Sequence, residues 1–93
     1  MIFLNPNQQS VSANGKSSHL TPKDFQILHF LMSHPGCTFS LEEIFRHTRQ
    51  EEPFEVRPII SVHIRHIREK IEVNPSRPVH VHYDMGLGYR FNA

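Results

Sequence analysis

The sequence predicts one α+β domain with short amino-terminal strands, three helices and a closing β-hairpin. Three observations lead to this prediction. Helix-start signals occur at residues 21–24 and 40–43, isoleucines recur at helical spacing within residues 58–72, and a glycine-containing turn interrupts residues 79–92. The length of 93 residues suits a single domain, 1–93, with a modest core.

The composition indicates a folded protein of a reducing compartment. Hydrophobic residues make up 38% of the chain and charged residues 20%, an ordinary globular mixture. No apolar run approaches the roughly 20 residues that span a bilayer, and the opening MIFL is too short for a signal peptide. Cys37 is the only cysteine, so no internal disulfide can form. We therefore expect a cytoplasmic protein with no membrane partner.

Residues 1–20 are expected to form a short antiparallel sheet. Val11 and Ala13 alternate with serines and lead into Asn14-Gly15. Asn-Gly is the strongest short hairpin signal, because both central residues of a type I′ turn need a positive φ.

The first two helices are predicted over residues 21–34 and 40–49. Thr21 is a suitable N-cap for the first helix, and the apolar residues that follow it recur at a spacing that buries most of its surface. Ser40 and Glu43 form a capping box at the start of the second.

The third helix is predicted over residues 58–72, after an exposed loop at residues 50–57. At 100° per residue, four isoleucines fall into one narrow stripe that should face the core. These isoleucines are Ile60, Ile64, Ile67 and Ile71. Val62 should point almost directly away from them, with Ile59 near it.

The outer side of this third helix is predicted to be basic. The cations of residues 57–71 are Arg57, Arg65, Arg68 and Lys70, and Glu69 is the only acid among them. A solvated helix face normally mixes the two signs at i,i+4 spacing. The charged residues in the first three turns of this helix are all basic, which favours nucleic-acid binding.

Residues 79–92 are expected to form the closing hairpin. Alternation with period two predicts a half-buried strand that turns Val79, Val81 and Tyr83 inward and His80 and His82 outward. Gly86 and Gly88 mark a turn, after which residues 89–91 can pair back.

Three helices closed by a hairpin form a winged helix-turn-helix. Four sequence motifs indicate which family of winged-helix proteins the chain resembles. LTPKDFQILHFL resembles the first helix of the OmpR/PhoB-type output domains of bacterial response regulators, and SLEEIF resembles the second. SVHIRHIREKI resembles the core of their recognition helix, and GLGYRF resembles their last wing strand. The similarity covers about residues 3–92.

The resemblance implies sequence-specific binding of double-stranded DNA by the output domain of a two-component transcription regulator. The recognition helix would enter the major groove, and the wing would contact the adjacent backbone or minor groove. The resemblance also implies a tandem homodimer on direct repeats and a loop at residues 49–57 that faces RNA polymerase. The loop residues assigned to this contact are Glu51, Glu52, Phe54 and Glu55. A receiver domain would have to lie outside these 93 residues.

Groove geometry gives the exposed side chains separate roles, because base edges display distinct donors, acceptors and methyls while cations reach phosphates. The phosphate contacts are assigned to Arg57, His63, Arg65 and Arg68, within a basic face that includes Lys70. The base contacts are assigned to Ser61, His66 and Val62, the last against thymine methyls. The wing contacts are assigned to the backbone of Gly88 and Tyr89 and the side chain of Arg90. Alternatively, Val62 packs against a neighbouring domain and Tyr89 is a core aromatic.

The chain departs from the family pattern at positions that usually contact DNA. His66 stands where members commonly carry an arginine that contacts DNA bases, and Glu69 stands where a basic residue is common. Met85 replaces the wing arginine. These departures support a rival function, a winged-helix protein-interaction module that uses the acidic loop and the apolar part of the helix face.

No metal site, cofactor or small-molecule substrate is predicted. His63 and His66 lie one helical turn apart and Cys37 is a conceivable extra ligand, but the chain lacks the paired cysteines and tight grouping typical of zinc sites. It also lacks a glycine-rich phosphate loop and a nucleophile motif. We therefore do not expect an enzyme.

Overall fold

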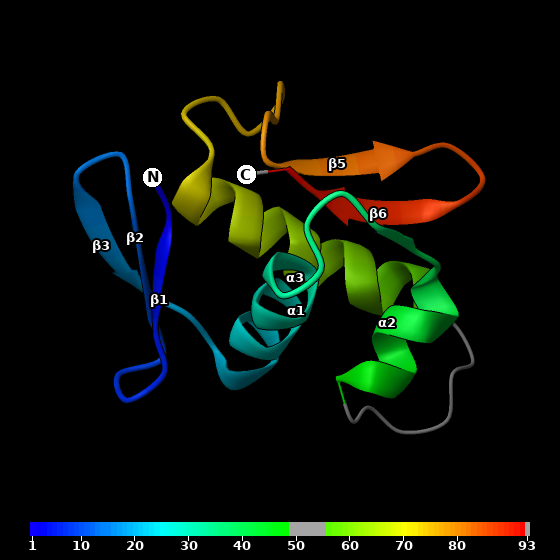
Figure 1. The fold of residues 1–93 in the computed structure, drawn as a ribbon, viewed down its shortest axis with the longest axis horizontal. Coiled ribbons are helices and arrows are strands. Elements are labelled where there is room, and N and C mark those ends of the chain that lie inside the picture. The colour runs from blue at the N-terminus through cyan, green and yellow to red at the C-terminus, as the bar shows by residue number, and fades with distance from the viewer. Residues whose placement is uncertain (49–55, 93) are drawn as a thin grey trace.

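A computed structural model describes residues 1–48 and 56–92, with the backbone alone for residues 56–59. The elements are β1 (Phe3–Asn5), β2 (Ser10–Ala13), β3 (Lys16–His19), α1 (Pro22–Met32), β4 (Thr38–Phe39), α2 (Leu41–His47), α3 (Val56–Ile71), β5 (Val81–Asp84) and β6 (Gly88–Phe91). Figure 1 shows α3 crossing the molecule from α2 to the first sheet, with the β5–β6 hairpin beside it. The predicted α+β winged-helix class is confirmed.

The strands form two small antiparallel sheets. The first has the order β1-β2-β3, and its second turn carries Asn14 and Gly15 with φ values of 55° and 73°. This is the positive-φ pair that the Asn-Gly signal predicts. The second sheet has the order β4-β6-β5, so β6 is its middle strand. Sequence periodicity did not predict β4, because two residues are too few to show an alternation.

Both predicted helix starts are present. The Thr21 hydroxyl accepts a hydrogen bond from the backbone N–H of Asp24 at 3.2 Å, and Pro22 opens α1. At α2, Ser40 and Glu43 complete the capping box, with bonds of 3.1 and 2.8 Å. These caps satisfy N–H groups that have no partner within a helix.

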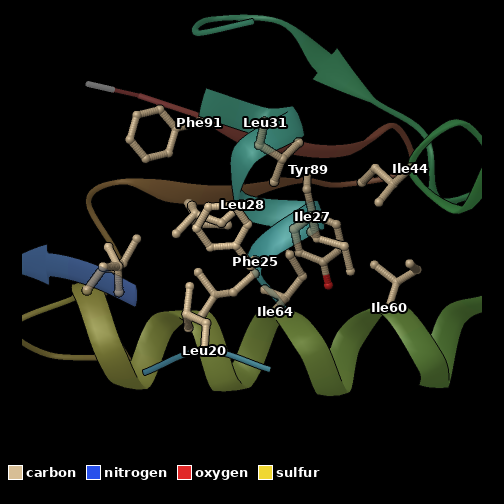
Figure 2. Packing of buried hydrophobic residues seen from close by; sticks show 14 of the residues in the cluster. Leu20, Phe25, Ile27, Leu28, Leu31, Ile44, Ile60, Ile64, Tyr89 and Phe91 are labelled. Atoms are coloured by element: carbon tan, nitrogen blue, oxygen red, sulfur yellow. The ribbon is translucent and has the colours of Figure 1, made fainter. Parts of the chain in front are cut away.

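The isoleucine stripe of α3 is the centre of the core. Ile60, Ile64, Ile67 and Ile71 are each at most 1% exposed. Figure 2 shows Ile64 directed from α3 toward the side chains of α1, and Ile60 directed toward Ile44 of α2. Complete burial of one such side chain stabilises a fold by roughly 1.5–3 kcal/mol. The stripe therefore determines how α3 is attached and which of its sides faces outward.

The closing hairpin differs from the predicted alternation at Val79. Strand β5 begins at Val81, which is fully buried, whereas Val79 is 61% exposed and precedes the strand. Tyr83 was also predicted to face inward, but it is 43% exposed, although its ring packs against Tyr89 with centroids 5.1 Å apart. The prediction of an inward Val79 was wrong, because its backbone N–H donates to the side chain of Glu72 and does not pair with a neighbouring strand.

The carboxylate of Glu72 lies at the end of α3 and is only 5% exposed. Backbone N–H groups of Val79, His80 and Val81 donate to its oxygens at 2.9, 3.0 and 2.9 Å. A buried carboxylate requires such donors. Glu72 therefore joins the end of α3 to the start of β5, a role that the sequence pattern did not indicate.

Gly88→Ala should destabilise the fold much more than Gly86→Ala. Both glycines have a positive φ, 144° and 77°, but a Cβ at Gly88 would collide with the carbonyl oxygen of Phe39, whereas a Cβ at Gly86 meets nothing within 4 Å. We expect a loss of about 1 kcal/mol at Gly86 and of more than about 3 kcal/mol at Gly88, measured by urea denaturation. Equal losses would contradict the close approach of β4 to β6.

Candidate nucleic-acid interface

The outer side of α3 presents a mixed polar and apolar surface. Its exposed members between residues 60 and 71 are Ser61, Val62, Arg65, Glu69 and Lys70. Val62 is 41% exposed and is the only exposed large hydrophobic residue in that stretch. At 100° per residue, Val62, Arg65 and Glu69 lie opposite the buried isoleucines, whereas Ser61 and Lys70 lie on the two flanks of the stripe.

Arg68 is half-buried and bound to the wing. Its Nε and Nη2 both donate to the carbonyl oxygen of Val81, at 3.2 and 3.0 Å. Its guanidinium carbon lies 5.8 Å from the ring centroid of Tyr89, a cation–π distance. Arg68 thus attaches both strands of the hairpin to α3, and this favours a positioning role over the predicted phosphate contact.

His63 and His66 occupy the opposite side of α3 and face α1. Nδ1 of His63 lies 2.6 Å from Oδ1 of Asp24, and Nδ1 of His66 lies 3.4 Å from Oδ2 of the same carboxylate. Asp24 is 2% exposed. The predicted phosphate contact of His63 therefore competes with a buried acid, and the Nδ1 side of His66 is directed into the protein.

The sequence-based interpretation missed Asp24, which was seen only as an acid in the first turn of a helix. It lies 39 residues from His63 in the chain, a separation that no local periodicity connects. One signal was available. Asp24 is an acid at a position of the first helix that folding buries, and a buried acid needs a cation or several hydrogen-bond donors, so a partner for it could have been expected.

The wing residues predicted to contact phosphates make internal contacts. Gly88 and Tyr89 are buried in the middle strand of the second sheet. Arg90 donates to Asp84 from Nε at 2.9 Å and from Nη2 at 3.0 Å, and to Asn92 from Nη1 at 2.7 Å. The geometry argues against all three as phosphate ligands, and it leaves Met85 and Leu87 exposed at the tip of the wing.

Asp84 is the acceptor at the centre of this wing. Besides Arg90, the hydroxyl of Thr38 donates to its Oδ2 at 2.5 Å, which links β4 to β5. Hydrogen bonds from Arg90 and then Thr38 lower the pKa of Asp84 from 3.8 to about 2. The same pairing raises the pKa of the Arg90 guanidinium. The ion pair therefore persists throughout the physiological pH range.

Some predicted site residues lie outside the part of the chain that the structure describes. These are the proposed polymerase-contact residues Glu51, Glu52, Phe54 and Glu55, together with the side chain of Arg57. In the described part, no helix combines the length and the apolar character that crossing a bilayer requires.

The comparison that decides the family is a match of residues 15–91 to the model described as transcriptional regulatory protein, C terminal. The chain belongs to this family. It is 41% identical over 89 residues to the transcriptional regulatory protein YcbL of Bacillus subtilis and 43% identical over 75 residues to the regulator RpaA of a Synechocystis strain. These alignments cover 96% and 81% of the chain.

The chain spans 39% and 31% of the lengths of these two relatives. Among solved structures, the response regulator DrrB of Thermotoga maritima, an OmpR/PhoB homologue, superimposes with a TM-score of 0.85 and 32% identity, over 99% of this chain and 42% of DrrB. The resemblance to OmpR/PhoB-type output domains that the four motifs predicted is therefore confirmed.

Arg68→Ala should lower the free energy of unfolding by about 1–2 kcal/mol, because it removes two hydrogen bonds from a charged donor and the contact with Tyr89. Arg65→Ala, which removes an exposed cation from the same helix, should cost less than about 0.5 kcal/mol. Urea denaturation compares the two. Equal stabilities would return Arg68 to its predicted phosphate role.

Asp84→Asn should lower the melting temperature at pH 7, and this difference should disappear as the pH falls from about 4 to about 2. Because the folded-state pKa is depressed from 3.8 to about 2, the carboxylate stabilises the fold above the ordinary value and loses that effect as the pH falls through the lower one. Thermal unfolding followed by circular dichroism measures both proteins. Glu69→Gln, at an exposed carboxylate, is the control. A difference that is unchanged at pH 2 would contradict the assignment.

Proposed function

We propose that this chain binds double-stranded DNA sequence-specifically as the output domain of a bacterial transcription regulator, with α3 in the major groove. One observation supports this most directly. The outward side of a helix that is rigidly packed on its other side carries cations, a hydroxyl and one apolar side chain, with no acid from residue 60 until Glu69. A helix of this kind fits the width of the major groove.

The described contacts divide the roles differently from sequence reasoning alone. Arg65 and Lys70 are exposed and are proposed as phosphate ligands, with Arg57 as a further candidate. Ser61 and His66 are proposed to meet base edges, and Val62 to meet thymine methyl groups. Arg68, Gly88, Tyr89 and Arg90 then shape the interface, because their contacts hold the wing in place.

Relatives support the proposal. RpaA is named as a DNA-binding dual master transcriptional regulator. The DNA-binding domain of the response regulator AdeR, in complex with an intercistronic region, shares the fold with a TM-score of 0.79 at 23% identity, over 98% of this chain and 93% of that one. We further propose tandem binding of two copies to direct repeats in the cytoplasm, and a contact of residues 49–57 with RNA polymerase.

Salt dependence and a charge deletion test the DNA contact together. Arg65→Ala should weaken binding to every duplex and make the slope of log K against log salt shallower by about 0.9, since one phosphate contact is lost. Fluorescence anisotropy over a salt series gives this slope. Lys16→Ala removes the same charge from β3 in the first sheet and should leave it unchanged. Equal effects of the two variants would contradict the assignment of Arg65.

A second experiment separates the residues that read the base sequence from those that contact phosphates. In a selection of bound sequences from random duplexes, His66→Ala should change which sequences are enriched, whereas Arg65→Ala should preserve the enriched sequence at lower affinity. Uniform loss of affinity with both variants would refute the division of roles.

A second function, a protein-interaction module, is favoured by the apolar tip of the wing. Met85 is 90% exposed and Leu87 is 67% exposed, and the nearby guanidinium groups of Arg68 and Arg90 are engaged internally. Exposed apolar side chains of this size suit a protein surface better than a phosphate backbone. DNA affinity that does not respond to ionic strength would favour this function over the first.

A further inference from the structure

The Asp24 side chain and the imidazoles of His63 and His66 bring three metal-ligand groups together between α1 and α3. One ligand atom from each residue lies within 4.8 Å of the others. In the described ranges 1–48 and 56–92, no other three histidine, cysteine or acidic side chains meet this condition. The two histidines belong to successive turns of one helix, and the acid comes from the first turn of another.

The spacing of these atoms suits a tetrahedral ion. Zinc binds imidazole nitrogen and carboxylate oxygen at about 2.0–2.2 Å, so neighbouring ligand atoms around it lie about 3.4 Å apart. The contact between His66 Nδ1 and Asp24 Oδ2 already measures 3.4 Å. The contact between His63 Nδ1 and the other oxygen, Asp24 Oδ1, measures 2.6 Å, so the two imidazoles approach different oxygens of one carboxylate. The ligand atoms of the three residues lie within 4.8 Å of one another, and binding of one ion would require side-chain rotations that bring them to about 3.4 Å.

The exposed fractions of the three side chains fit a metal site that has three protein ligands and one coordination position open to solvent. Asp24 is nearly fully buried, so its charge requires a cation or donors, and its side-chain partners among the described residues are the two imidazoles. The side chains of His63 and His66 are 20% and 38% exposed. Three protein ligands with solvent on one side leave room for a water as the fourth ligand.

We propose that Asp24, His63 and His66 bind a divalent transition-metal ion, with Zn²⁺ as the best match to two imidazoles and one carboxylate. The ion joins α1 to the flank of α3. This inference does not depend on the proposed DNA binding, and it revises the expectation from sequence, where Asp24 was not available as the third ligand.

The direct test is isothermal titration of the 93-residue chain with ZnCl₂ in the absence of DNA. The wild type should bind one equivalent, and His66→Ala should weaken binding at least about 100-fold, since one of three ligands is lost. His82→Ala is the matched control, because its imidazole lies on β5 and its Nε2 contacts the carbonyl oxygen of Val79. It should bind zinc as the wild type does.

Asp24→Asn tests the buried ligand with almost no change of shape. Thermal unfolding without metal reports whether each variant still folds, and His66→Ala alters a partly exposed side chain, so it keeps the test valid if Asp24→Asn does not fold. Co²⁺ in place of Zn²⁺ adds a spectroscopic readout, since a tetrahedral site gives intense visible absorption that should be absent in His66→Ala. Zinc binding that is absent from the wild type, or equal in the wild type and His66→Ala, would overturn the proposal.

Discussion

The burial of four isoleucines along one side of α3 is the constraint on which the rest of this structure depends. Because the helical period is about 3.6 residues, turning Ile60, Ile64, Ile67 and Ile71 inward leaves no freedom for the other positions. Val62 and Glu69 must face outward. On the flanks of the stripe, Arg68 faces the wing and His63 and His66 face α1, while Ser61 and Lys70 stay exposed. The apolar core thus decides which chemistry α3 can present.

Polar contacts on both flanks hold α3 at this rotation. On one side, Arg68 donates to the backbone of Val81, and on the other side the imidazoles of His63 and His66 meet Asp24. Side chains engaged in this way are poorly placed to contact phosphates. The sequence of α3 therefore suggests more phosphate contacts than its structure offers. Among the described side chains of α3, the cations that remain exposed are Arg65 and Lys70.

Local signals in the sequence were sufficient for most of the fold. Thr21, Ser40 and Asn14-Gly15 act through contacts within a few residues, so their effects could be predicted without knowledge of the rest of the chain. The isoleucine stripe is likewise a local periodicity. The sequence therefore predicted the class, the order of the helices and the outward direction of Val62.

The features that escaped prediction all rely on contacts between different elements of the fold. Strand β4 exists because it pairs with β6, and Thr38 meets Asp84 across 46 residues. From the sequence, Arg68 was predicted to contact phosphate and Glu72 was given no role, whereas both side chains bond to the start of the hairpin. Periodicity reports which side of an element is buried, but it does not report what lies against that side.

His66 is where the two proposals meet, because an imidazole has two distinct nitrogens. With Nδ1–H directed to Asp24, a neutral ring leaves Nε2 as an acceptor, which suits the amino groups of cytosine or adenine in the major groove. With Nδ1 bound to a metal ion, Nε2 carries the proton and becomes a donor, which suits guanine O6 and N7 or thymine O4. Metal occupancy would therefore change the base that His66 prefers while leaving the backbone of α3 in place. A selection of bound duplexes performed with and without Zn²⁺ would show this as a changed preference at one base position in the wild type and none in His66→Ala.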